Sequence, residues 1–166
     1  HTFDDADTGQ FFFRMEFNYR GTGEFSEESL CHQLTERASS FEVEWELRNL
    51  GTPEKVVILV SKYDHCLQDL LHRYSTGALN IEVPAIISNH PDLQKQAGWY
   101  NIPYYHLPVT PETKVEQEAK MWDIIQQSEA DLVVLARYMQ VLSEDMCKKL
   151  HGQAINIHHS LLPGFK

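Results

Sequence analysis

The sequence has little basic charge and no long apolar run, and both shortages exclude classes of protein. Its 166 residues carry 14 Lys and Arg against 24 Asp and Glu, which gives a formal net charge of −10. Nucleic acid is therefore excluded as a partner, because few basic groups remain to displace counterions from phosphates. A membrane is excluded as a partner too, because a spanning helix needs about 18 consecutive apolar residues and no such run occurs.

Cysteine is also scarce. Cys31, Cys66 and Cys147 lie far apart and form no C-x-x-C pair, so neither a disulfide framework nor a zinc knuckle is predicted. No other group of residues has metal-ligand spacing, and no metal is expected. The start, HTFDDADTGQ, is polar and acidic and is unlike a signal peptide, which together with the cysteine usage predicts a cytoplasmic protein.

Residues 1–50 are predicted to form a small α+β unit. The aromatic segment Phe11–Asn18 is expected to be a strand. Ser26 is a candidate N-cap followed by acidic residues, which favours a helix. Glu42–Leu50 alternates apolar and polar side chains, as a half-buried strand does. The expected order is strand, helix, strand.

Residues 51–55 contain Gly and Pro and are interpreted as a linker, after which strands and helices alternate through residues 56–166. This alternation predicts a parallel sheet with helices on both faces. Strands are expected at Val56–Val60, Ile81–Ser88, Tyr104–Pro108, Asp131–Ala136 and Ala154–His158. Helices are expected at His65–Tyr74, at Asp92–Ala97, from Thr110 onward with a buried stripe of Val115, Ala119, Trp122 and Ile125, and after the N-cap Ser143.

Ligands of such sheets bind at the carboxyl ends of the strands. The loop after the first strand of this sheet, Ser61–Cys66, contains no glycine. A nucleotide-binding unit would carry a Gly-rich phosphate loop there, so dinucleotide and ATP binding are disfavoured. Within this loop Asp64 and His65 are expected to cap the following helix.

Asn156 and His158 close the last predicted strand. They are two residues apart on an extended chain, so their side chains project to the same side. Asn can donate a hydrogen bond to a developing oxyanion, and His can transfer a proton near neutral pH. The pair suits attack on a carbonyl or formyl carbon.

A longer string around this pair resembles a known family. NIHHSLLPGF resembles the N-I-H-x-S-L-L-P signature of the folate-dependent formyltransferase fold, and LARYMQVLS is similar to its pterin-binding segment. His-His-Ser at residues 158–160 and the loop sequence VSKYDHCLQDLLHR look like formyltetrahydrofolate deformylases. HTFDDADTGQFFFRMEF resembles the middle of the ACT domain that precedes the catalytic domain in deformylases.

The resemblance implies a fold of class α/β, in which a partial ACT-like α+β domain (1–50) precedes a Rossmann-like, parallel-sheet formyltransferase-fold domain (56–166) that is itself incomplete. The chain begins at His1 without a Met and ends three residues after Pro163. We therefore expect truncation at both ends. The catalytic Asp that the family carries downstream is absent, and this chain alone is expected to be inactive.

The resemblance also implies hydrolysis of 10-formyltetrahydrofolate to tetrahydrofolate and formate, which supplies formate for purine biosynthesis and balances one-carbon pools. Asn156 and His158 would be catalytic. The implied substrate-binding residues are Tyr138, Met139, Gln140, Val141, Leu142, His159 and Ser160. The role of His159 stays open between substrate contact and packing. No permanently bound cofactor is implied, because the folate is the substrate.

Two alternatives stay open. One is a formyltransferase of the same fold with another acceptor, although the bulky Lys62–His65 loop fits a blocked acceptor site. The other is a non-catalytic module that senses a folate or an amino acid. The ACT resemblance further implies an amino-acid effector and a homo-oligomer.

Overall fold

The computed structural model describes residues 2–5, 9–20, 25–41 and 43–156. The chain divides into two compact units, His1–Arg48 and Asn49–Lys166, and each is described by itself. Among the described residues, no helix is long and apolar enough to cross a membrane.

In the first unit, β1 (Thr2–Asp5) pairs antiparallel with β2 (Gln10–Phe13). The sequence prediction missed β1 and extended β2 too far, since the strand ends at Phe13. Helix α1 (Glu27–Ala38) begins where predicted, because Ser26 Oγ accepts a hydrogen bond from the backbone N–H of Ser29 at 3.1 Å.

The strand expected at Glu42–Leu50 is wrong: residues 43–49 have no strand structure. A strand needs a neighbour to accept and donate its backbone hydrogen bonds, and no strand in the described parts of the chain pairs with this segment. The apolar side of the alternation stays accessible, with Val43 and Trp45 both exposed. The observed order in this unit is therefore strand, strand, helix.

The second unit contains a six-stranded sheet whose pairs are all parallel, which confirms the predicted fold class. The order is β6-β5-β3-β7-β8, and β4 pairs with the start of β3. The strands are β3 (Glu54–Val60), β4 (Ile81–Glu82), β5 (Ile86–Ser88), β6 (Tyr104–His106), β7 (Leu132–Leu135) and β8 (Ala154–Asn156). The helices are α2 (His65–Ser75), α3 (Gln94–Trp99), α4 (Lys114–Gln127) and α5 (Glu144–Lys149).

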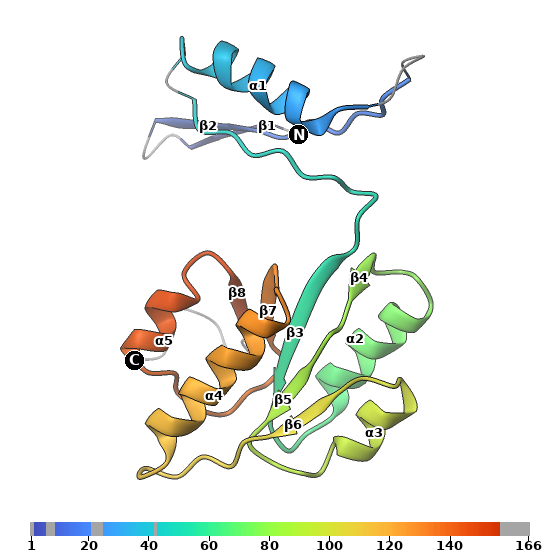
Figure 1. The fold of residues 1–166 in the computed structure, drawn as a ribbon, viewed down its shortest axis with the longest axis vertical. Helices are drawn as coiled ribbons and strands as arrows, with labels where there is room; N and C mark the ends of the chain where they lie inside the picture. The colour runs from blue at the N-terminus through green and yellow to red at the C-terminus, as the bar shows by residue number, and fades with distance from the viewer. Residues whose placement is uncertain (1, 6–8, 21–24, 42, 157–166) are drawn as a thin grey trace. The chain divides into compact units, whose positions relative to one another are not determined.

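Strand β3 lies at the centre and is covered on both faces. Each residue from Val56 to Val60 is 3% exposed or less. Val56, Ile58 and Val60 belong to a core shared with α2 and α3, whereas Val57 and Leu59 belong to a core shared with α4 and α5. Figure 1 shows the two helix pairs on opposite faces of the sheet. The continuous apolar run is therefore explained by burial on both sides.

The single strand expected at Ile81–Ser88 is wrong, because β4 and β5 are separate. Pro84 lies in the break and has no N–H to donate to a ladder. Both strands still pair with β3, β4 at Glu54–Lys55 and β5 at Ile58–Val60.

The buried stripe expected on α4 is only partly confirmed. Ile125 is buried and Trp122 half-buried, but Val115 is 81% exposed and Ala119 is exposed as well, and Met121 is buried instead. The helix begins at Lys114 instead of Thr110. The residues before it form a turn in which Thr113 N–H donates to Thr110 Oγ1 at 3.2 Å.

Met121 and Val115 make a matched test of this orientation. Met121→Ala removes a side chain that is 0% exposed and should lower the free energy of unfolding by about 2–5 kcal/mol. Val115→Ala, on the same helix, should change it by less than about 0.5 kcal/mol. Urea denaturation followed by circular dichroism measures both, and equal losses would contradict this orientation of α4.

Candidate functional site

The sheet changes direction between β3 and β7. From β3 the chain first builds outward through β5 and β6, and later returns to add β7 and β8 on the other side. Ligands bind outside the carboxyl ends of the strands at such a switch point. A ligand site is therefore expected at the loops that begin at Ser61, after β3, and at Ala136, after β7.

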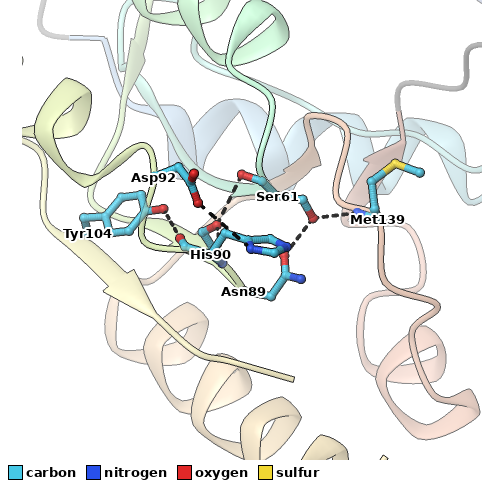
Figure 2. Close-up of polar contacts among 7 residues, drawn as sticks. Ser61, Asn89, His90, Asp92, Tyr104 and Met139 are labelled. Atoms are coloured by element: carbon cyan, nitrogen blue, oxygen red, sulfur yellow. Dashed lines mark hydrogen bonds and ion pairs between the residues drawn. The ribbon is translucent and has the colours of Figure 1, made fainter. Parts of the chain in front are cut away.

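The hydroxyl of Ser61 joins three of these loops. Ser61 is 2% exposed, and its Oγ donates to Asn89 Oδ1 at 2.7 Å. The same oxygen accepts from the backbone N–H of Met139 at 2.8 Å. Figure 2 shows the two bonds meeting at Ser61. The segments after β3, β5 and β7 are thus fixed to one buried atom.

The segment after β5 has further supports (Figure 2). Ser88 Oγ donates to the carbonyl of Ser61 at 3.4 Å and accepts from the N–H of His90 at 3.1 Å. Tyr104 Oη donates to the carbonyl of His90. Asp92 Oδ2 lies 4.0 Å from His90 Nδ1. Burial is the main cause of the raised pKa of the Tyr104 phenol.

The predicted pterin-binding residues divide into anchors and exposed residues. Tyr138 is buried and Leu142 half-buried in the core shared with α4 and α5. Gln140 is half-buried, whereas Met139 and Val141 are exposed. The anchors hold the segment to the fold, and the exposed apolar side chains remain free to contact a ligand.

Burial raises the pKa of Tyr138 to about 12, with a smaller contribution from the charge of Glu118. Glu118 is itself buried, and its Oε1 accepts from the N–H of Ser143 at 2.9 Å. Ser143 begins α5 as predicted, because its Oγ accepts from Met146 N–H at 3.2 Å. The far end of the segment after β7 is therefore tied to α4 and α5.

Asn156 is the last residue of β8 and is exposed. It is the register partner of Leu135, the last residue of β7, so Asn156 and the segment after β7 lie at the same edge of the sheet. His158, His159 and Ser160 fall outside the described residues. The part of the chain that the structure describes contains no group of three or more His, Cys, Asp or Glu suited to hold a metal ion.

Arg137 has an unusual backbone and unusual neighbours. Its φ is +60°, a left-handed conformation that costs a non-glycine residue on the order of 1–3 kcal/mol. Its Nη1 lies 3.2 Å from Nε2 of His65, and its Cζ lies 4.5 Å from the centroid of the Tyr63 ring. This residue therefore connects the segments after β3 and β7.

The capping role expected for the Asp64 side chain is wrong. Asp64 occupies the N-cap position of α2 but makes no capping bond, and its carboxylate accepts from the Gln68 side chain instead. Ser61, Asn89 and Arg137 were not among the predicted site residues. A usable signal existed for the positions of the first two, since Ser61 directly follows β3 and Asn89 directly follows β5.

Ser61→Ala tests the junction of the three loops. It removes one donor and leaves Met139 N–H without its partner, so the free energy of unfolding should fall by about 1–3 kcal/mol. Hydrogen exchange at the Met139 amide should accelerate as well. Ser75→Ala is the control, because that exposed hydroxyl only bonds the His72 carbonyl within α2. Unchanged exchange at Met139 would contradict the assignment.

Tyr138→Phe tests the burial of the phenol. A raised folded-state pKa means that the neutral phenol stabilises the folded protein below the usual pKa of 10.0, and that this contribution is lost as pH rises toward about 12. Between pH 10 and 12 the variant should therefore lose about 2 kcal/mol less stability than the wild type. Denaturation at both pH values measures it, and parallel losses would contradict the prediction.

Comparisons with known proteins agree with this architecture. The chain is 45% identical over 164 residues to formyltetrahydrofolate deformylase of Corynebacterium sp. (strain P-1), covering 99% of this chain and 57% of that protein. A crystal structure of a formyltetrahydrofolate deformylase from Pseudomonas putida KT2440 matches with a TM-score of 0.90 and 51% identity, covering 100% of this chain and 59% of that one.

A phosphoribosylglycinamide formyltransferase from Coxiella burnetii matches less of the chain, with a TM-score of 0.63, 32% identity and coverage of 68% of this chain and 55% of that one. This chain thus spans little more than half the length of these relatives. Residues 54–166 match the formyl transferase family itself. Since that match covers the whole sheet with its switch-point site, the chain belongs to the formyl transferase family.

Proposed function

We propose that the protein hydrolyses 10-formyltetrahydrofolate to tetrahydrofolate and formate. The observation that carries this proposal is the extent of the similarity. The two deformylases match 99% and 100% of this chain, so both units are shared with them. The formyltransferase matches only 68%.

In the proposed reaction, the oxygen of a water molecule adds to the formyl carbon and the carbonyl oxygen becomes an oxyanion. Asn156, exposed at the end of β8, would donate its side-chain N–H to that oxyanion. The bond between the formyl carbon and the folate nitrogen then breaks. His158 would pass a proton to the departing nitrogen, which leaves formate and tetrahydrofolate.

The segment after β7 would bind the pterin. Met139 and Val141 offer exposed apolar side chains, and the bond from Met139 N–H to the buried Ser61 fixes their backbone. Gln140, together with His159 and Ser160, completes the proposed binding set. No permanently bound cofactor is proposed, because the folate is the substrate.

The first unit would carry the regulatory part of the proposal. The large apolar side chains of β2 are exposed, Phe11, Phe12 and Phe13 among them, which suits a homo-oligomer contact or an amino-acid effector. Formate release measured with and without added amino acids tests the effector, and a rate that no amino acid changes would contradict it.

Asn156→Ala tests the proposed oxyanion contact in the protein at its natural length. With 10-formyltetrahydrofolate and no added acceptor, wild-type protein should release formate and tetrahydrofolate in equal amounts. The variant should release formate about 100- to 1,000-fold more slowly.

Gln153→Ala is the matched control. Gln153 also carries a carboxamide, but it precedes β8 and so lies at the opposite end of that strand. It should retain wild-type turnover. Wild-type protein that releases no formate, or equal rates for Asn156→Ala and Gln153→Ala, would contradict the proposal.

A further inference from the structure

Three side chains, here called the Arg137 cluster, occupy the switch point on the β3 side of the site. They are Tyr63 and His65, which follow β3, and Arg137, which follows β7. Asn156 ends β8, on the other side of β7. Arg137 follows β7 and Asn156 ends the neighbouring strand β8, so both lie at the same edge of the sheet, about one strand spacing of 4.8 Å apart in strand order.

Among the described residues, the guanidinium of Arg137 contacts two rings and no carboxylate. Its Nη1 lies 3.2 Å from Nε2 and 3.5 Å from Nδ1 of the His65 ring. The group also lies over the Tyr63 ring, 4.5 Å from its centroid, as cations commonly do. Within the described ranges, Arg137 forms no ion pair.

The backbone supports the idea that this side chain is placed for function. A φ of +60° is readily adopted by glycine and is unfavourable for arginine. Unfavourable backbone conformations concentrate at functional sites, where the surrounding structure holds them in place. Here the holding contacts are the His65 and Tyr63 rings, which lie in a different segment of the chain.

We propose that Arg137 determines the acceptor of the formyl group, by excluding amines and admitting water. This inference rests on the proposed function and deepens it. Amine acceptors are larger than water and simple amines are largely protonated near neutral pH, so a guanidinium fixed at this edge of the sheet would exclude such a cation by volume and by like charge. Neutral water experiences neither effect.

The two outcomes of the reaction differ only in the acceptor. When water attacks the formyl carbon, the carbon–nitrogen bond to the folate breaks, a proton moves to the folate nitrogen, and formate leaves. When a primary amine attacks the same carbon, the same bond breaks, the amine proton moves to the folate nitrogen, and a formamide leaves. The ratio of formamide to formate therefore reports the acceptor directly.

Arg137→Gly is the decisive variant, because glycine accepts the left-handed backbone and the substitution should not unfold the site. Arg137→Lys keeps the charge but loses the planar group that stacks on Tyr63. Arg73→Ala is the control, since Arg73 lies on α2 and pairs with Asp69. All are assayed at natural length with 10-formyltetrahydrofolate and glycinamide, and N-formylglycinamide and formate are quantified together.

Wild-type and Arg73→Ala protein should give formate with almost no formamide. Arg137→Gly should raise the ratio of formamide to formate by at least about tenfold, and Arg137→Lys should raise it less. An unchanged ratio in Arg137→Gly would overturn the inference, as would appreciable formamide from the wild type.

A second measurement needs no turnover and so separates this inference from the proposed function. Saturation-transfer NMR should detect glycinamide bound to Arg137→Gly but not to the wild type. Equal binding to both proteins, or to neither, would overturn the role of Arg137 even if formate release were normal. If glycinamide binds Arg137→Gly and not the wild type, but neither protein releases formate, only the proposed function would be contradicted.

Discussion

The burial of β3 on both faces is the constraint on which the rest of the second unit depends. Its residues from Val56 to Val60 are inaccessible to solvent on either side, so helices must cover both faces, and parallel strands require crossover connections to bring those helices there. One pair of crossovers builds the β5–β6 side and the other the β7–β8 side. The switch point between β3 and β7 follows from this arrangement, and with it the place where a ligand can bind.

Polar side chains hold the site together by forming hydrogen bonds with loop groups that would otherwise lack a partner. A buried polar atom without a partner is costly, and the described residues contain none among their side chains. Ser61 bonds groups of two segments at once, because its hydroxyl donates to the Asn89 side chain and accepts from the Met139 backbone N–H. A single buried serine therefore couples the shape of the segment after β7 to the segment after β5, although these strands are not neighbours in the sheet.

The sequence was informative where one local rule decided the structure. Ser26 and Ser143 cap helices because their side chains reach N–H groups three residues ahead, and Val56–Val60 is a buried strand because only burial on both faces suits such a run. The sequence was misleading where the structure of a segment depends on a pairing strand elsewhere in the chain. The apolar alternation after residue 42 predicted a strand, yet no described strand pairs with it. The positions of Tyr138 and Asn156 at strand ends could be predicted, but the Ser61 junction could not, since its atoms meet across 78 residues.

The absence of a Gly-rich loop and the presence of Arg137 are two aspects of one arrangement. A glycine loop after β3 leaves room for an anionic ligand close to the backbone, whereas the loop here carries Tyr63 and His65, whose rings contact Arg137. An arginine after β7 can then adopt an unfavourable φ, because the rings recover energy through the contacts at 3.2 and 4.5 Å. The residues of the loop after β3 and the conformation of Arg137 after β7 are understood only when the two segments are considered together. Under the role proposed for Arg137, the two segments together would place a fixed positive charge where a second substrate would otherwise approach.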